Sequence, residues 1–144
     1  MKLPARFHRF AQTLAHRLGR RGAALLWIGF LDLVIGWSLV DPVSRPLVRH
    51  APIYHAAFQL AAPSVWAALW AAAGLVCLVQ APMRLDRVGF ACAIAVKLTW
   101  ALLITVSWLA DGAVRGWLSA VVWYTFAAFI GVIAGWPEQE ATQP

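Results

Sequence analysis

Four long apolar stretches, at about 22–40, 58–81, 88–109 and 113–136, constrain this chain more than any other feature. A transmembrane helix needs roughly 20 predominantly apolar residues to cross the hydrocarbon core of a bilayer, and each stretch is about that long. In the whole chain 62% of residues are hydrophobic and 12% are charged, whereas a soluble domain carries about 25% charged residues. The sequence therefore predicts an all-α polytopic membrane protein with four transmembrane helices and no soluble domain.

Short links between the stretches predict how the helices run. Residues 82–87 separate the second stretch from the third, and residues 110–112 separate the third from the fourth. Because links this short force neighbouring helices to run antiparallel, we expect two antiparallel hairpins. The first link, at 41–57, is longer and holds three prolines, which break helices. We expect the second span to begin between Phe58 and Pro63, because proline fits the first turn of a helix.

Residues 1–21 carry six of the twelve Lys and Arg residues, just ahead of the first apolar stretch. Leucines and phenylalanines recur in this segment at three- and four-residue steps, and basic residues fall on the adjoining arc. A helix with such faces lies in the membrane interface, where its basic side attracts anionic lipid. We expect a short amphipathic interfacial helix here, with a frayed basic tail as the alternative. The polar residues 137–144 predict a disordered tail.

The net charge of +6 raises the question of nucleic acid as a partner. Nucleic-acid binding needs a solvated basic surface, whereas here the basic residues flank apolar stretches, where they set membrane topology. Segment 1–21 and link 82–87 hold six plus two Lys and Arg residues, against three near the other two links. We therefore expect the lipid bilayer as partner and no nucleic acid. The predicted location is the bacterial cytoplasmic membrane, with several passes and both termini cytoplasmic.

Two ionisable residues, Asp32 and Lys97, lie near the middles of the first and third stretches. A charge at the bilayer centre costs about 2.5–3.5 kcal/mol on the insertion scale, so such residues face protein and often pair. Counted at 1.5 Å per residue, both lie roughly 14–15 Å from the same end of their spans, which predicts an ion pair. Tyr124 and Thr125 fall near that depth in the fourth stretch and are candidate polar neighbours. A structural pair, a proton- or ion-coupled site and separate polar contacts all remain open.

Small residues recur along single faces of two predicted helices. In the first stretch they share a face with Asp32, so that the aspartate lies in a packing seam. Such stripes let another helix approach closely and support association of a polytopic protein with itself or a membrane partner. The predicted helix-packing residues are Gly22, Gly29 and Gly36 in the first stretch and Ala127, Gly131 and Gly135 in the fourth.

Three tryptophans, Trp70, Trp100 and Trp123, fall near mid-depth of the predicted spans. Tryptophans that anchor a protein to the bilayer gather at the interfaces. At mid-depth they are more typical of helix packing, where the indole N–H needs a partner. We expect these three to lie between helices.

The sequence holds no catalytic motif. It has no glycine-rich phosphate loop, no Ser/His/Asp set and no HExxH pattern, and its four histidines lie outside the apolar stretches. The two cysteines, Cys77 and Cys92, fit small apolar packing positions better than a metal site, for which two thiols are too few. We expect no enzyme activity, no metal and no cofactor.

Three segments carry a family resemblance. They are RRGAALLWIG at 20–29, LDRVGFA at 85–91 and IAGWPE at 133–138. Together they resemble small, uncharacterised four-span membrane proteins encoded by phages of high-GC actinobacteria, some of which are proposed as holins. The resemblance implies four helices and a membrane role, and it supplies no catalytic residue.

Three functions are compatible with these features. The leading hypothesis is a non-enzymatic inner-membrane protein of phage or prophage type, either holin-like or envelope-modulating. The second is a small proton- or ion-coupled transporter that uses Asp32, against which Lys97 argues, because a neutralised aspartate is a poor cation site. The third is an accessory subunit of a larger membrane complex.

Overall fold

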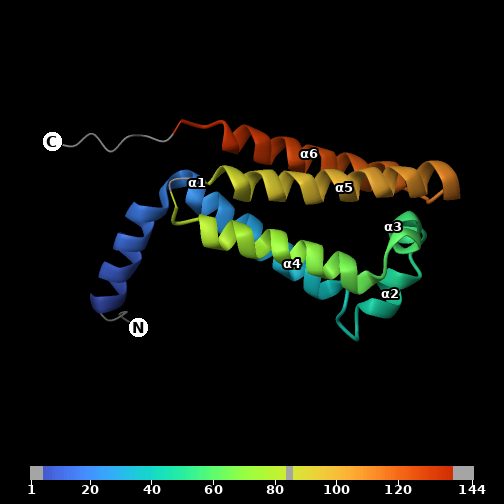
Figure 1. Cartoon of the computed structure of the whole chain (residues 1–144), viewed down its shortest axis with the longest axis horizontal. Coiled ribbons are helices and arrows are strands. Elements are labelled where there is room, and N and C mark those ends of the chain that lie inside the picture. Colours follow the sequence, from blue (N-terminus) through green and yellow to red (C-terminus); the bar gives the residue numbers. More distant parts are fainter. Residues whose placement is uncertain (1–4, 84–85, 138–144) are drawn as a thin grey trace.

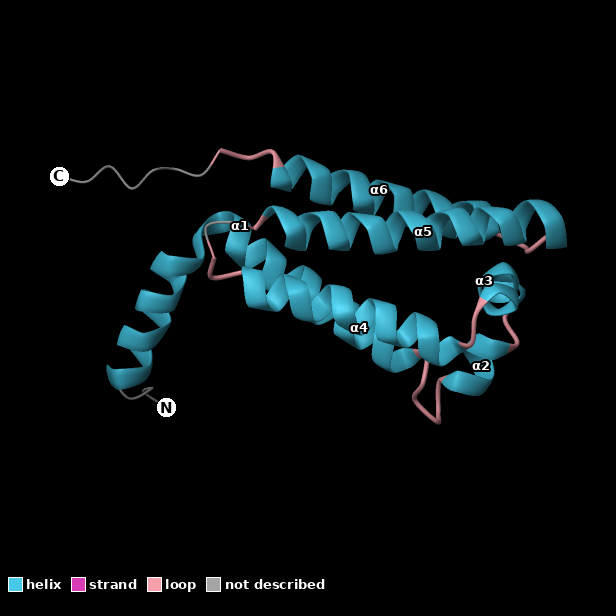
Figure 2. Ribbon diagram, viewed as in Figure 1, coloured by secondary structure: helices cyan, strands magenta, loops and turns pink. Residues whose placement is uncertain are grey.

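A computed structural model describes residues 5–83 and 86–137, except for the side chains of residues 5–18 and 45. Every regular element in this part of the chain is a helix (Figure 2), which confirms the all-α prediction. The elements are α1 (Ala5–Ser38), α2 (Arg45–Arg49), the 3-10 helix η1 (Pro52–Tyr54), α3 (His55–Leu60), α4 (Pro63–Gln80), α5 (Arg87–Asp111) and α6 (Gly116–Ala134).

Four of these helices are long and apolar enough to cross a membrane. They are the Gly19–Ser38 part of α1, together with α4, α5 and α6. α4 begins at Pro63, with the proline in its first turn, because the residues before it form the separate helix α3. α6 begins later than predicted because Gly112 and Arg115 turn the chain with positive φ angles of 63° and 62°.

Helix α1 consists of two helices that meet at Gly19. This residue has φ 53° and ψ −178°, a region that essentially only glycine adopts. The segment before it leaves the bundle at an angle (Figure 1). From Ala5 onward the predicted interfacial segment is therefore helical, but its predicted apolar and basic faces depend on side chains that the structure does not describe. The tail predicted at 137–144 also lies outside them, apart from Pro137.

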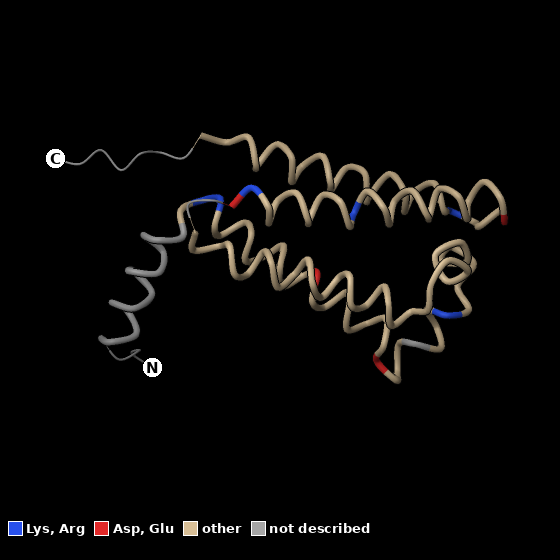
Figure 3. The backbone as a smooth tube through the Cα atoms, in the orientation of Figure 1, with Lys and Arg blue, Asp and Glu red and all other residues tan. Residues whose placement is uncertain are grey.

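The four long helices form two closely packed pairs, α1 with α4 and α5 with α6 (Figure 1). α4 also packs on α5 and so joins the pairs. We call the end that holds Gly19 and the α4–α5 link the near end, and the opposite end the far end. Most charged positions lie toward these two ends, and one acidic and one basic position lie near the middle of the bundle (Figure 3). Residues 41–62, which we call the strap, comprise α2, η1 and α3 at the far end.

Glycines bring α1 and α4 into backbone contact. A Cβ atom added to Gly29 would lie 2.7 Å from the carbonyl oxygen of Gly74, and one added to Gly74 would lie 2.7 Å from that of Gly29. A Cβ on Gly36 would lie 2.9 Å from the Ala67 carbonyl oxygen. Gly22 is also buried. The predicted small-residue seam of the first span is thus present, and the helix that fills it is α4.

The predicted small-residue face of α6 is divided. Ala127 is 2% exposed and lies inside the bundle. Gly131 and Gly135 are exposed, and a Cβ on Gly131 would have no neighbour closer than Ile94 Cδ1 at 4.0 Å. Only one of the three residues therefore packs within the chain.

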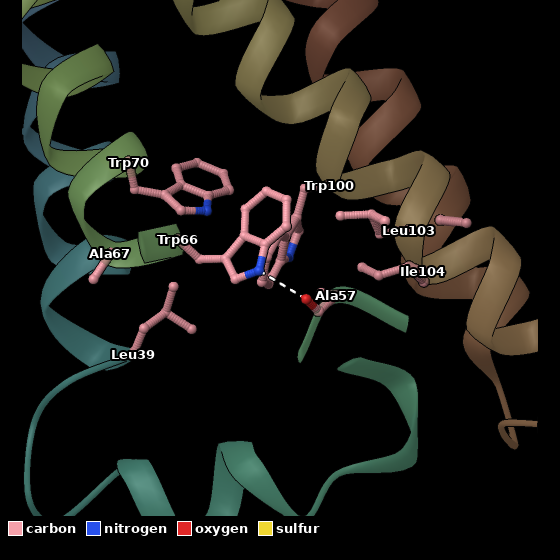
Figure 4. Close-up of a cluster of buried hydrophobic side chains, with 9 residues drawn as sticks. Leu39, Ala57, Trp66, Ala67, Trp70, Trp100, Leu103 and Ile104 are labelled. Carbon is pink, nitrogen blue, oxygen red and sulfur yellow. Dashed lines mark hydrogen bonds between the residues drawn. The ribbon is translucent and has the colours of Figure 1, made fainter. Parts of the chain in front are cut away.

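The buried core falls into two clusters along the bundle. The near-end cluster is mainly aliphatic, with Leu25, Ile28, Ile130 and Ile133, and also holds Phe90. The far-end cluster is rich in tryptophan (Figure 4). Its members are Leu39, Ala57, Trp66, Ala67, Trp70, Trp100, Leu103, Ile104 and Ala120.

Candidate functional site: a buried ion pair and its surroundings

Asp32 of α1 and Lys97 of α5 form an ion pair inside the bundle. Lys97 Nζ donates to Asp32 Oδ1 at 2.6 Å, and both side chains are 0% exposed. The contact predicted between the first and third spans is thus present. Asp32 reaches α5 because it lies between Gly29 and Gly36, whose backbone contacts with α4 hold α1 inside the bundle.

Aromatic rings surround the ammonium group of Lys97. Its Nζ atom lies 5.3 Å from the ring centroid of Trp70 and 5.4 Å from that of Phe126. The negative faces of aromatic rings attract a cation, more strongly where water is excluded. The lysine is therefore held by one carboxylate from α1 and by two rings from α4 and α6, so the site draws on all four long helices.

The second carboxylate oxygen of Asp32 has no such support. Asp32 Oδ2 is buried and has no hydrogen-bond partner in the described part of the chain. A buried acceptor without a partner costs roughly 1–3 kcal/mol. The pair can thus fix the register of α1 against α5, and it leaves one lone acceptor in the protein interior.

The structure does not bring Tyr124 and Thr125 to the pair. Tyr124 is 38% exposed and Thr125 is also exposed, so both face outward from α6. The two residues lie next to Phe126 and so near the depth of the pair, but they lie on the opposite, outward face of α6. The neighbour that α6 supplies is Phe126, one position further along.

The cysteines are separate packing residues. Cys77 is buried and its thiol donates to the Gly89 carbonyl at 3.3 Å, while Cys92 is partly buried, and both are free thiols. Among the described residues no group of three or more His, Cys, Asp or Glu side chains is placed to hold a metal ion.

A second charge contact closes the near end, and the sequence analysis missed it. Arg21 of α1 donates to Asp86 Oδ1 at 2.6 Å, just before α5 begins. The side chains are 17% and 4% exposed. Arg21 also donates to the Trp136 carbonyl at 3.4 Å, past the end of α6. The sequence does place an arginine and an aspartate at the predicted inner boundary, but charge counting there predicts topology and lipid contact and does not predict a pair.

Tryptophan side chains pack between the ion pair and the far end of the bundle. Trp100 lies 5.6 Å from Trp66 and 5.9 Å from Trp70, measured between ring centroids, and Trp70 lies 5.4 Å from Trp123. The three tryptophans predicted to pack between helices do so. Trp66 Nε1 donates to the Ala57 carbonyl at 2.8 Å (Figure 4), which fastens the strap to α4. The far-end cluster, which we also call the tryptophan cluster, thus lies between the ion pair and the strap.

No protein-family model, no curated protein and no solved structure matches this chain. The structure and the sequence pattern are therefore the basis for a functional proposal.

Proposed function

We propose that this chain is a non-enzymatic integral membrane protein that acts by associating laterally within the bilayer, as a holin-like or envelope-modulating protein of phage type. The sealed ion pair is the observation that supports the proposal most directly. Both charges are 0% exposed, and carboxylate and aromatic rings surround the ammonium group. Charges arranged in this way hold helices together, and they leave the outward faces for contacts with lipid or other chains.

The outward faces support lateral association. A shallow groove of about 600 Å³ runs between α1 and α4. Two alanines of α4, Ala68 and Ala71, line part of it, and larger side chains of α1, including Phe30, Val34 and Trp37, line much of the rest. Gly131 of α6 and Gly135, which directly follows the helix, are exposed. Small residues on a lipid-facing surface let a second helix approach closely.

Controlled expression in bacteria tests the proposal. We expect a rise in membrane permeability to a normally excluded dye once the protein accumulates. The variant Gly131→Leu places a bulky side chain on the outward face of α6, where the space is open, and we expect it to fold normally but to permeabilise less. Unchanged dye exclusion at high expression of the intact protein would overturn the holin-like proposal.

Proton-coupled transport is the second candidate, and the free Asp32 Oδ2 atom favours it. A buried acceptor without a partner is available to take up a proton. The test is pH-gradient-driven flux in liposomes containing the wild-type protein or Asp32→Asn, which keeps the shape of the side chain. Loss of flux at an equal amount of folded, reconstituted protein supports transport, whereas absence of flux in the wild type removes it.

The proposed location is the bacterial cytoplasmic membrane with both termini inside. The excess of Lys and Arg near the amino-terminal segment and the α4–α5 link supports this orientation. Reporter fusions to each terminus test it, because an enzyme active only in the cytoplasm should be active at both.

A further inference from the structure

The strap is tied to the far end of α5 by contacts of two kinds. The first kind carries no charge. The Ala56 backbone N–H donates to Ser107 Oγ at 2.9 Å, and the Tyr54 ring lies 5.5 Å from that of Trp100. Ser107 is 0% exposed and Ala57 is 2% exposed, so the first turn of α3 is firmly seated.

The second kind of contact contains a titratable pair. His55 Nδ1 lies 3.0 Å from Asp111 Oδ2 at the end of α5. The other ring nitrogen of His55, Nε2, lies 3.1 Å from Gln59 Nε2. The side chains of His55 and Asp111 are 52% and 31% exposed. The pair is therefore accessible to protons from the solution at the far end, unlike Asp32 and Lys97.

The geometry accommodates both protonation states of the imidazole. In the neutral ring, Nδ1–H donates to Asp111 and Nε2 accepts from the Gln59 amide. When the ring is charged, both nitrogens donate, and the Gln59 amide turns to offer its oxygen. The Asp111 carboxylate makes this hydrogen bond charge-assisted even when the ring is neutral. Protonation of the ring adds the attraction between opposite charges, so it strengthens the contact without breaking another.

An ordinary imidazole gains a proton as the solution is acidified from about pH 7.5 to about pH 5.5. Tyr54 of η1 stays neutral, because burial raises the pKa of its phenol. Arg115, the other charged residue just after α5, is exposed in the link to α6. Among the described residues, Asp111 is the charged side chain that contacts His55.

We propose that the strap is an acid-tightened latch, in which protonation of His55 at the far end draws α3 onto α5 through Asp111. The strap covers the tryptophan cluster that separates the far end from the ion pair. Its seating therefore controls how often water reaches that cluster. Because the protonated ring and the carboxylate carry opposite charges, the extra attraction is present at low pH and is lost as the pH rises.

Hydrogen exchange of residues 50–62 in lipid nanodiscs, which expose both faces to one pH, tests the latch. After correction for the intrinsic exchange of an unfolded peptide of the same sequence, we expect about two- to fivefold stronger protection at pH 5.5 than at pH 7.5, the range that an exposed ion pair supports. Both His55→Gln and Asp111→Asn should abolish this difference.

His50→Gln is the matched control, because His50 is an exposed histidine of the same strap. It should keep the wild-type response to pH. Equal protection at both pH values in the wild type, or a full response that survives in His55→Gln, would overturn the latch. A response lost in His50→Gln but kept in Asp111→Asn would assign the effect to another histidine and would overturn it as well.

Discussion

One face of α1 and one face of α6 both carry glycines at helical spacing, but the face of α1 is buried against another helix and the face of α6 is exposed. On α1, Gly29 and Gly36 pack against the backbone of α4, and Asp32 between them pairs with Lys97. Gly131 of α6 and Gly135, which directly follows the helix, are exposed. Both sets are small residues at helical spacing, yet only the glycines on α1 pack against another helix of the chain.

The charge accounts for the difference between the two faces. A stripe of small residues permits another helix to approach closely, but exposing such a stripe to lipid costs little free energy. The stripe alone therefore does not determine whether that face of the helix lies against protein or against lipid. An aspartate at mid-depth has no such freedom, because its charge must be shielded by protein. The face of α1 is thus fixed by Asp32, whereas nothing polar on the Gly131 face requires burial.

Loss of the aspartate should produce the largest effect. Asp32→Leu removes the carboxylate from Lys97 and leaves an unpaired ammonium group in the core. Removal of one partner of a buried pair costs about 3–5 kcal/mol, and we expect a loss of that order in the free energy of unfolding, measured in detergent micelles.

The double variant Asp32→Leu/Lys97→Leu is the control for that prediction. With both charges gone, leucines of similar volume fill the space, and much of the lost stability should return. If the single and double variants were equally unstable, the pair would not be what fixes the face of α1.

A methyl group on each face gives the next largest effect. In Gly29→Ala the new Cβ atom would lie 2.7 Å from the Gly74 carbonyl oxygen, so α1 and α4 must move apart. Overpacking of this kind costs about 1–3 kcal/mol. In Gly131→Ala the new Cβ atom would lie 4.0 Å from Ile94 Cδ1, its nearest neighbour on another described helix. Higher helix propensity should then leave stability unchanged or raise it by up to about 1 kcal/mol. Similar thermal unfolding of the two variants would contradict the comparison.

The near-end contact should matter less than the ion pair in the middle. Arg21→Gln leaves Asp86, whose side chain is 4% exposed, without its charged partner. A hydrogen bond to a charged group contributes about 1.5–3 kcal/mol, and partial exposure of Arg21 places the expected loss at the lower end of that range. Arg20→Gln is the matched control, because Arg20 is exposed and stacks on Trp136 instead. An equal loss in both variants, measured by thermal unfolding, would show that general charge and not the Asp86 contact matters.

Much of the helical framework was predictable from the sequence, because length and apolarity determine which segments can cross a bilayer. The Asp32–Lys97 contact was predictable as well, since depth can be counted along a helix and opposite charges attract. Depth counting failed for Tyr124 and Thr125, because it gives height but not the face of a helix. Depth counting also did not identify Phe126, because nothing in the sequence indicates that this apolar ring lies beside an ammonium group. The seat of the strap on α5 depends on long-range contacts such as Ala56 with Ser107, which no local pattern specifies.

The outward face of α6 provides the prediction with the smallest expected effect. Tyr124→Phe removes a hydroxyl from a side chain that is 38% exposed, away from the ion pair. Surface changes that break no special feature usually stay within about 0.5 kcal/mol, and we expect no larger shift in thermal unfolding. Phe126→Ala is the contrasting variant on the same helix, because it removes one of the two rings over Lys97 and should destabilise the protein clearly more than Tyr124→Phe. A larger loss in Tyr124→Phe than in Phe126→Ala would mean that α6 presents its tyrosine to the core, and that the two faces of this helix are the reverse of those described.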